Sequence, residues 1–190
     1  SDEELAALAS SVVMITLHNS RGKVIGTGSG MIIGKDGYIL TNFHVAGGAR
    51  SFSVQLENDD TVYRTSELIK YHPSLDLAIL RIDRQQLSPM KLYSGRRELC
   101  RGQRVVAIGS PLGLFNTVSD GIISGFREIN GVDMIQFTAP ISGGSSGGAL
   151  LNMYGEVIGI STAGFSKGQN LNLAVGYKDI IPFISNFTDK

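Results

Sequence analysis

The stretch Ser142–Leu150 constrains this chain more than any other, because it reads Ser-Gly-Gly-Ser-Ser-Gly-Gly-Ala-Leu between two strand-like runs. The flanking runs are Met134–Phe137 and Val157–Ala163. Glycine tolerates backbone angles that are closed to other residues, so glycines on both sides of a serine pair indicate a tight, forced backbone path. Acyl transfer is one chemistry that needs such a path, because a serine hydroxyl must project from a turn whose backbone N–H groups converge on an oxyanion. A flexible Gly/Ser linker is the alternative interpretation.

Short runs of branched and aromatic residues recur along most of the chain, separated by Gly and Asp turns at a spacing of about 8–12 residues. This spacing favours a barrel or a sandwich over βαβ units. One series of runs ends near Ile82, a second begins at Arg104, and the stretch Gln85–Gln103 between them is polar and basic. We therefore predict an all-β chain with two six-stranded antiparallel β-barrels side by side, within residues 1–90 and 104–176 of a single domain of ordinary size.

Short helices are predicted at both ends of the chain. Ser1-Asp2-Glu3-Glu4 forms a capping box that opens a helix through Leu5–Leu8. Residues 177–188 carry apolar side chains at helical spacing and are expected to close the chain, with Pro182 tolerated only near the first turn of that helix. Within the first barrel, Thr61–Tyr71 is expected to form one strand run.

Composition excludes several classes of protein. The 17 basic and 17 acidic side chains cancel, so no global field favours nucleic acid or an anionic membrane. No apolar run approaches the roughly 18 residues of a membrane-spanning helix. Cys100 is the only cysteine, cannot form an internal disulfide, and is interpreted as a small buried hydrophobe. With one cysteine and three scattered histidines, a zinc site is not expected, and we predict no metal and no cofactor.

A serine at neutral pH is a poor nucleophile unless a base takes its proton and a further group fixes the tautomer of that base. His44 directly follows the predicted strand Tyr38–Thr41. Asp76 precedes the apolar run Leu77–Ile82, where a lone carboxylate would be costly without a partner. The order His44, Asp76, Ser146 is the one found in double-barrel proteases. Each residue alone could be structural, but together they predict a catalytic triad in the cleft between the two lobes.

The other two histidines and a second glycine-rich stretch are interpreted as structural. His18 follows a strand and His72 precedes Pro73, and neither has a setting like that of His44. The stretch Gly26–Gly30 lacks the spacing of a nucleotide-binding loop and opens no helix. We expect it to be a strand that packs close beneath its neighbour.

Five motifs have an order and spacing that resemble the HtrA (Deg) family of trypsin-like serine proteases, from about Ser11 to Ile184. They read Gly28-Ser29-Gly30, Thr41-Asn42-Phe43-His44-Val45, Asp76-Leu77-Ala78-Ile79-Leu80, Gly109-Ser110-Pro111-Leu112-Gly113 and Gly144-Ser145-Ser146-Gly147-Gly148. The resemblance implies a trypsin-like double barrel. Family members usually have Asn before the nucleophile and Pro after the glycine pair, whereas this chain has Ser145 and Ala149.

By this resemblance, Ser146 is the nucleophile, His44 the general base and acid, and Asp76 the carboxylate that orients the histidine. The backbone N–H groups of Gly144 and Ser146, helped by Ser145, would form the oxyanion hole. Thr162 matches a position whose hydroxyl often supports the aspartate.

The resemblance also implies where a substrate would bind. The pocket for its side chain would be lined by Ile141, Ala163 and the strand around Leu173, and an extended substrate would pair with Thr162–Gly164 as an added strand. No acidic residue lies in Thr138–Gly143 or at Ala163 and Gly164 to bind Lys or Arg, so we expect a preference for small or medium aliphatic side chains.

The function implied is a serine endopeptidase that hydrolyses unfolded or extended polypeptides in protein quality control. A latent peptide-binding or chaperone module on the same fold is the alternative, and an esterase of another fold is disfavoured because no helical run follows Ser146. The resemblance further implies a location outside the cytoplasm, periplasmic or secreted. Family members often form homotrimers through the N-terminal segment; residues 1–11 could do so here, although nothing in their pattern requires it. No PDZ domain is expected within this chain.

Overall fold

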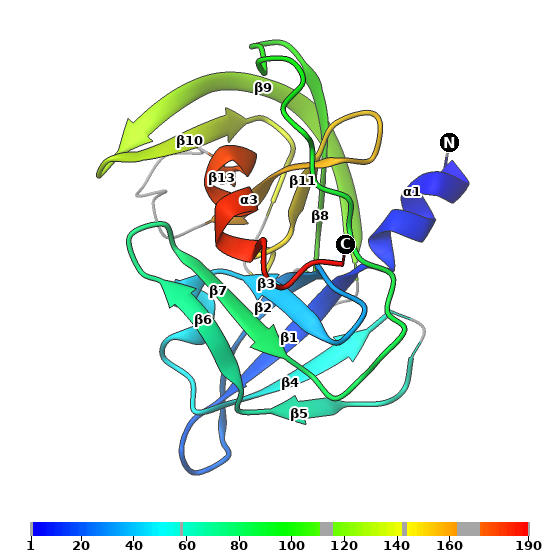
Figure 1. Cartoon of the computed structure of the whole chain (residues 1–190), viewed down its shortest axis with the longest axis vertical. Coiled ribbons are helices and arrows are strands. Elements are labelled where there is room, and N and C mark those ends of the chain that lie inside the picture. Colours follow the sequence, from blue (N-terminus) through cyan, green and yellow to red (C-terminus); the bar gives the residue numbers. More distant parts are fainter. Residues whose placement is uncertain (1, 58, 111–115, 142–143, 163–171, 190) are drawn as a thin grey trace.

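The computed structural model describes residues 2–57, 59–110, 116–141, 144–162 and 172–189 of the chain. Two β-structured lobes pack against each other, with β1–β7 forming the first lobe and β8–β13 the second (Figure 1). The predicted all-β class with two barrel-like sheets is therefore confirmed.

The first lobe is an antiparallel sheet of seven strands in the order β5-β4-β1-β2-β3-β7-β6. It differs from the predicted six-stranded barrel in strand number, and β5 and β6 lie at its two edges. The strands are β1 (Val12–His18), β2 (Val24–Ile32), β3 (Tyr38–Thr41), β4 (Ser51–Leu56), β5 (Tyr63–Thr65), β6 (Leu68–His72) and β7 (Leu77–Arg81).

The extra strand arises because the run Thr61–Tyr71 divides in two. The Thr65 hydroxyl accepts a hydrogen bond from the Glu67 N–H at 3.0 Å, and the Ser66 carbonyl accepts one from the Leu68 N–H at 3.2 Å. A threonine that bonds the backbone two residues ahead competes with strand pairing, so the chain turns there. β5 then pairs with β4 and β6 pairs with β7.

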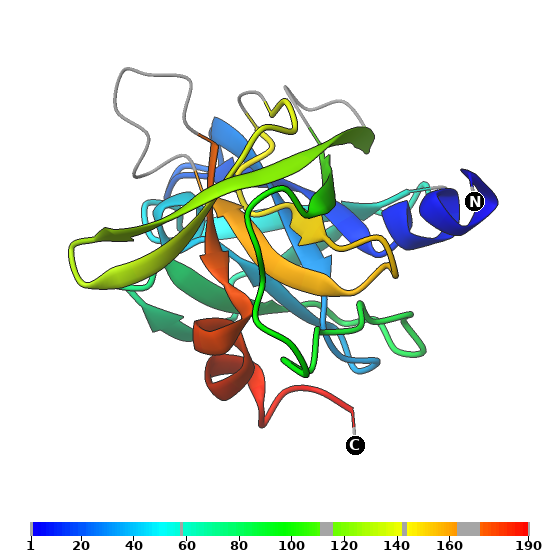
Figure 2. The same cartoon turned by 90° about the horizontal axis from the view of Figure 1, so that it is seen from above.

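The second lobe is a closed six-stranded barrel in the order β10-β13-β12-β11-β8-β9, as predicted for this half of the chain. In both views of the molecule, the long β9–β10 hairpin wraps over one side of this lobe (Figures 1 and 2). The strands are β8 (Arg104–Gly109), β9 (Thr117–Ile129), β10 (Val132–Phe137), β11 (Ala149–Leu151), β12 (Val157–Thr162) and β13 (Asn172–Gly176).

Three helices complete the described part of the chain: α1 (Asp2–Ala9), α2 (Phe43–Ala46) and α3 (Tyr177–Ile184). Helices at both ends were predicted, but α2 was not. Pro182 is the sixth residue of α3 rather than a first-turn residue, which differs from the expectation, and the helix ends two residues later. An interior proline removes one backbone hydrogen bond, here the one that residue 182 would donate to the Lys178 carbonyl. Among the described helices, none is long and apolar enough to cross a membrane.

The largest apolar cluster lies between the lobes and joins them. It combines side chains of the first lobe such as Met31 and Leu77 with side chains of the second such as Ile108 and Ile160, together with Ile180 of α3. Each lobe also has a smaller cluster of its own. Because burying apolar surface is the dominant favourable term in folding, this shared cluster fixes how the two lobes face each other.

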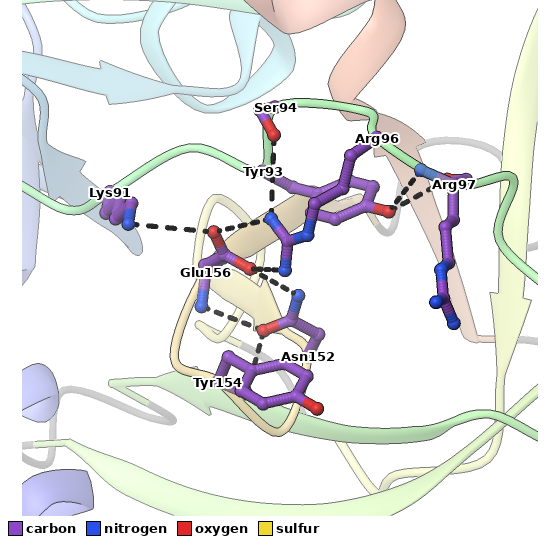
Figure 3. A network of polar contacts seen from close by, with 8 residues as sticks. All are labelled: Lys91, Tyr93, Ser94, Arg96, Arg97, Asn152, Tyr154 and Glu156. Atoms are coloured by element: carbon purple, nitrogen blue, oxygen red, sulfur yellow. Dashed lines mark hydrogen bonds and ion pairs between the residues drawn. The ribbon is translucent and has the colours of Figure 1, made fainter.

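The segment that links the lobes is anchored to the turn between β11 and β12 (Figure 3). Glu156, only 4% exposed, accepts hydrogen bonds from the Arg96 guanidinium at 3.0 and 3.3 Å and from the Asn152 amide at 3.0 Å. The Arg96 contact, then the Asn152 contact, lower the pKa of the Glu156 carboxyl below its ordinary value. Backbone bonds from Tyr93 to Val157 and from Val157 to Lys91 reinforce the anchor.

Cys100, in the same linking segment, was predicted to be a small buried hydrophobe. This prediction is wrong, because its side chain is exposed and its thiol is free. The adjacent Leu99 packs against the core of the second lobe, whereas the Cys100 thiol lies at the surface, 3.7 Å from the Glu98 carbonyl oxygen.

The glycine-rich stretch Gly26–Gly30 lies within β2 and packs as predicted. A Cβ on Gly28 would lie 2.6 Å from a methyl group of Val45, and one on Gly30 would lie 2.8 Å from a methyl group of Ile39. These glycines let β2 approach α2 and β3 closely, which brings the backbone of Ser29 to the region of the site described next.

Candidate active site

His44, Asp76 and Ser146 lie together where the two lobes meet. The Nδ1 atom of His44 is 2.6 Å from Oδ2 of Asp76, and its Nε2 atom is 3.0 Å from the Ser146 hydroxyl oxygen. His44 belongs to α2, Asp76 to the turn before β7, and Ser146 to the turn before β11. The imidazole thus bridges an acid of the first lobe and an alcohol of the second.

Asp76 holds α2 with both its side chain and its backbone. Its Oδ1 atom accepts the backbone N–H of His44 at 2.7 Å, and its carbonyl accepts the backbone N–H of Phe43 at 3.1 Å. Asp76 itself has a φ of 58°, a left-handed conformation that aspartate tolerates better than most residues. The base and the acid are therefore fixed relative to each other by a turn of one lobe.

The hydrogen-bond pattern assigns the tautomer of His44. Because the carboxylate of Asp76 can only accept, the Nδ1 atom that faces it carries the ring proton. The neutral ring then presents the lone pair of Nε2 to the Ser146 hydroxyl. This is the arrangement that a general base requires.

Thr162 lies behind the carboxylate and completes its coordination. Its hydroxyl donates to Oδ2 of Asp76 at 2.7 Å, and both residues are buried. A buried carboxylate is costly unless it is hydrogen-bonded, and here Asp76 is bonded by Thr162 and twice by His44. The contact of Thr162 with the aspartate is the one that the family resemblance implies.

The turn that carries Ser146 needs the glycines that follow it. Gly147 has a φ of 92°, and a Cβ on it would collide with the carbonyl oxygen of Ser29. A Cβ on Gly148 would collide with the carbonyl oxygen of Ile108. The Gly147 N–H donates to the Ser161 carbonyl at 2.8 Å, and the Ser146 carbonyl accepts from the Ser29 N–H at 2.9 Å. From Ser145 onward the turn is buried and bonded on both sides, which excludes a flexible linker there.

The residues predicted to form the oxyanion hole begin at Gly144, which has a φ of 89°. Its carbonyl accepts a hydrogen bond from the Ser29 hydroxyl at 2.7 Å, and the same hydroxyl accepts from the Ser110 N–H at 2.8 Å. Ser145 is buried beside Gly109. Ser142 and Gly143 lie outside the described residues, so the oxyanion hole stays a prediction.

Only some of the residues predicted to line the substrate pocket lie in the described part of the chain. Half-buried Ile141 borders a small cavity of about 40 Å³ that Ser145 and Ser161 also line. Leu173 is 1% exposed and packs in the cluster between the lobes, so its side chain faces the core. Ala163 and Gly164 lie outside the described residues.

Two polar residues at the site were not singled out from the sequence. Asn42 is fully buried, and its Oδ1 atom is 2.7 Å from the Ser146 hydroxyl oxygen. Ser29, also fully buried, bonds the nucleophile turn as described above. Both belong to motifs on which the family resemblance depends, and that membership was the only signal that could have found them.

The remaining candidates for chemistry lie elsewhere. His18 is buried with its Nε2 atom 2.7 Å from the Ser53 hydroxyl, and His72 accepts the Leu75 N–H at 3.1 Å. Within the described residues, no group of three or more His, Cys, Asp or Glu side chains could hold a metal ion.

Residues 28–160 match the protein family described as "Trypsin-like peptidase domain". The chain is 43% identical over 144 residues to the "Probable periplasmic serine endoprotease DegP-like" of Pseudomonas fluorescens, covering 74% of this chain and 30% of that protein. It is 35% identical over 173 residues to the "Anti-sigma-I factor RsgI9" of Acetivibrio thermocellus, covering 90% of this chain and 24% of that protein. The solved structure of the serine endoprotease from Yersinia pestis is similar with a TM-score of 0.84 and 32% identity, covering 97% of this chain and 65% of that one. The chain thus spans less than a third of either of these curated relatives.

Proposed function

Because the chain belongs to the trypsin-like peptidase family, as an HtrA-type serine endopeptidase domain, we propose that His44, Asp76 and Ser146 hydrolyse peptide bonds in unfolded or extended polypeptides. The observation that carries this proposal is the unbroken series of short hydrogen bonds from Thr162 through Asp76 and His44 to Ser146. Such a series supplies a base, its tautomer and a nucleophile at one place.

In the proposed reaction, the Ser146 oxygen attacks the scissile carbonyl carbon while its proton moves to Nε2 of His44. The carbonyl electron pair moves onto oxygen, where the N–H groups of Gly144 and Ser146 are proposed to stabilise it. The C–N bond then breaks, and His44 returns the proton to the leaving amine. Water repeats the sequence on the acyl-enzyme, again with His44 as base, while the Asp76 carboxylate stabilises the imidazolium each time.

The proposed substrates are segments with small or medium aliphatic side chains. The small cavity beside Ile141 and Ser145 supports this preference, because its described lining has no acidic side chain that could bind Lys or Arg. A peptide-library profile should therefore show cleavage after residues such as Val, Ala or Ile. A dominant preference for Arg or Lys would contradict it.

A latent peptide-binding module on the same fold is the second candidate. The observation in its favour is that the Ser146 hydroxyl is closer to Asn42, at 2.7 Å, than to Nε2 of His44, at 3.0 Å. Because a hydroxyl has one proton, a Ser146 hydroxyl that donates to Asn42 does not donate to its base.

The two candidates separate in one experiment. Wild type and Ser146→Ala are incubated with a fluorophosphonate probe and, separately, with labelled casein. The proposal expects labelling and cleavage by wild type and a loss on the order of 10⁶ in turnover for Ser146→Ala, as found when the nucleophile of a comparable triad is removed. A folded wild-type protein that neither reacts with the probe nor cleaves casein would favour the latent module.

The proposed cellular location rests on the name of a relative. The word "periplasmic" in the name of the Pseudomonas relative supports a location outside the cytoplasm. Homotrimer formation through residues 1–11 stays a prediction, and both views show α1 projecting from the side of the molecule, where a partner could reach it (Figures 1 and 2).

A further inference from the structure

Among the described residues, two acceptor atoms lie within hydrogen-bond distance of the Ser146 hydroxyl oxygen. One is Nε2 of His44 at 3.0 Å, and the other is Oδ1 of Asn42 at 2.7 Å. A hydroxyl has one proton to donate, so it cannot make a full hydrogen bond to both at once. Which acceptor receives it depends on the protonation of His44.

The orientation of the Asn42 amide is determined by its second partner. Its Nδ2 group donates to the carbonyl oxygen of Asp76 at 3.1 Å, and that oxygen can only accept. Turning the amide over would set two acceptor oxygens against each other there, so Oδ1 faces Ser146. Asn42 is fully buried, which holds the amide in this place.

We propose that Asn42 is a positioning residue for the nucleophile: it accepts the Ser146 hydroxyl hydrogen bond whenever His44 is protonated, and thereby favours the protonated, inactive form of the free enzyme. This inference rests on the proposed function, because it assigns Asn42 a role toward the same serine and base.

The asymmetry between the two forms of His44 follows from counting donors. When His44 is neutral, the Ser146 hydroxyl can donate to Nε2, and Asn42 is not required. When the ring carries both protons, Nε2–H donates to the Ser146 oxygen, and the Ser146 hydroxyl must donate elsewhere. Asn42 Oδ1 at 2.7 Å is the acceptor that allows both bonds to exist together. A bond available only to the charged form favours that form.

The acyl-enzyme provides an internal contrast. There the Ser146 oxygen is part of an ester and carries no proton, so Asn42 has no hydroxyl to accept. Asn42 should therefore influence the pH dependence of acylation and leave that of deacylation unchanged.

The charges of the described groups around His44 stay constant when Asn42 is replaced by Ala, whereas Asn42→Asp adds a carboxylate. Asp76 is the charged group in contact with the ring, and the second lobe contributes the uncharged hydroxyls of Ser146 and Thr162. α2 also packs against β6 and β7, whose titratable side chains have other described partners. Lys70 donates to the Phe183 carbonyl, Tyr71 stacks on Phe43, His72 accepts from Leu75, and Arg81 lies over the ring of Tyr38.

The test compares wild type with Asn42→Ala by using a fluorophosphonate probe across pH. In labelling, the Ser146 oxygen forms a bond to phosphorus, fluoride leaves, and the Ser146 proton moves to His44. Labelling slows in acid as His44 becomes protonated. The acid limb is the part of the profile of labelling rate against pH where the rate falls in acid. For Asn42→Ala, this limb should move to lower pH by about 0.5–1 unit, the effect of losing one neutral hydrogen bond from the protonated form.

The same variants are then measured with p-nitrophenyl acetate. The burst of nitrophenolate reports acylation, and the steady-state rate reports deacylation. The acid limb of the burst should shift as in the labelling experiment, whereas the limb of deacylation should stay at its wild-type position. An unshifted burst, or an equal shift of both limbs, would overturn the inference.

A second variant at the same position guards against simple structural damage. Asn42→Asp keeps an acceptor oxygen toward Ser146 and adds a negative charge that also favours protonated His44, so the acid limb of its pH–rate profile should lie at or above that of wild type. General loosening of the site would move Ala and Asp variants in the same direction. If Asn42→Ala does not fold, an Asp variant with its limb below that of wild type overturns the inference by itself.

Two controls complete the design. Ser53→Ala removes a buried hydroxyl that bonds His18 rather than the site, and it should lower stability without moving either limb. Wild type that is not labelled at any pH would mean that the proposed function fails. Labelled wild type with unshifted Asn42 variants would mean that only the inference fails.

Discussion

The two lobes hold their parts of the site in different ways. In the first lobe, one residue organises the rest: the carboxylate and carbonyl of Asp76 bind His44, Phe43 and Asn42 through hydrogen bonds within that lobe. In the second lobe, the turn around Ser146 is shaped by glycines pressed against neighbouring carbonyls, and one of these carbonyls belongs to Ser29 of the first lobe. The acid–base pair is thus held mainly by its own lobe, with one added bond from Thr162 of the second lobe, whereas the position of the nucleophile depends on how the lobes dock.

Among the predicted variants, Asp76→Asn should have the largest effect, because it disrupts the acid–base pair of the first lobe. An amide in this position can donate to Nδ1 of His44, which reverses the tautomer and places a proton on Nε2, where the base must accept one. We expect the turnover number to fall on the order of 10⁴-fold, measured as kcat on a peptide substrate. Activity within tenfold of wild type in a folded variant would show that the carboxylate does not orient the base.

Gly147→Ala should disrupt the turn of the second lobe that carries Ser146. The new Cβ would collide with the Ser29 carbonyl while the residue is held at a left-handed φ of 92°, so the turn must move and carry Ser146 away from His44. We expect loss of fluorophosphonate labelling by about 10²-fold or more, as expected when a nucleophile is misplaced by about 1 Å.

Gly131→Ala is the matched control for Gly147→Ala. Gly131 also has a left-handed φ, 79°, but a Cβ there meets nothing within 4 Å. It should cost only about 1–2 kcal/mol of stability and leave labelling unchanged. Equal labelling of Gly147→Ala and Gly131→Ala would show that the close packing of the Ser146 turn against the first lobe does not affect activity.

Ser29→Ala sharpens the comparison, because it removes a side-chain contact between the lobes and keeps the strand. The Gly144 carbonyl loses its donor and the Ser110 N–H loses its acceptor. We expect kcat/KM to fall about tenfold and the free energy of unfolding to fall by about 1–3 kcal/mol, measured by denaturant titration. Ser11→Ala, which removes a buried hydroxyl that donates to the Ser88 carbonyl, should lower stability alone.

The smallest effect on activity is expected at the linking segment. Glu156 has its pKa lowered in the folded protein, chiefly by Arg96, from an ordinary value of 4.5. Its charged form therefore stabilises the fold above about pH 4.5, and this contribution is lost as the pH falls through the lowered value. Glu156→Gln should lower the melting temperature at neutral pH and flatten its decline in acid, with kcat/KM unchanged at the activity optimum.

The linking-segment prediction is checked by melting curves between pH 3 and pH 7 for wild type and Glu156→Gln. A melting temperature of the variant that falls with acid as steeply as that of wild type would show that Glu156 does not contribute to acid sensitivity. Arg96→Gln tests the other partner of the ion pair and should reproduce the loss at neutral pH.

Much of the fold could be predicted, and the misses have local causes. Short apolar runs bounded by turn residues identify strands such as β1 and β7, whose side chains are mostly buried. The division of Thr61–Tyr71 was missed because a single hydroxyl-to-backbone bond at Thr65 decides it. Helix α2 was missed because a four-residue helix has no periodic pattern to detect, and it is held by Asp76, which lies 32 residues from His44 in the sequence.

The order and local settings of His44, Asp76 and Ser146 were determined by the sequence itself. The glycines around Ser146 and the acid directly before an apolar strand are patterns of neighbouring residues, so they can be recognised without the fold. The tertiary structure alone decided that Asn42 faces Ser146, 104 residues later, and that Ser29 bonds the turn of the other lobe. Contacts between polar side chains so far apart in sequence have no period and no local pattern. They come into existence only when the shared apolar cluster docks the two lobes.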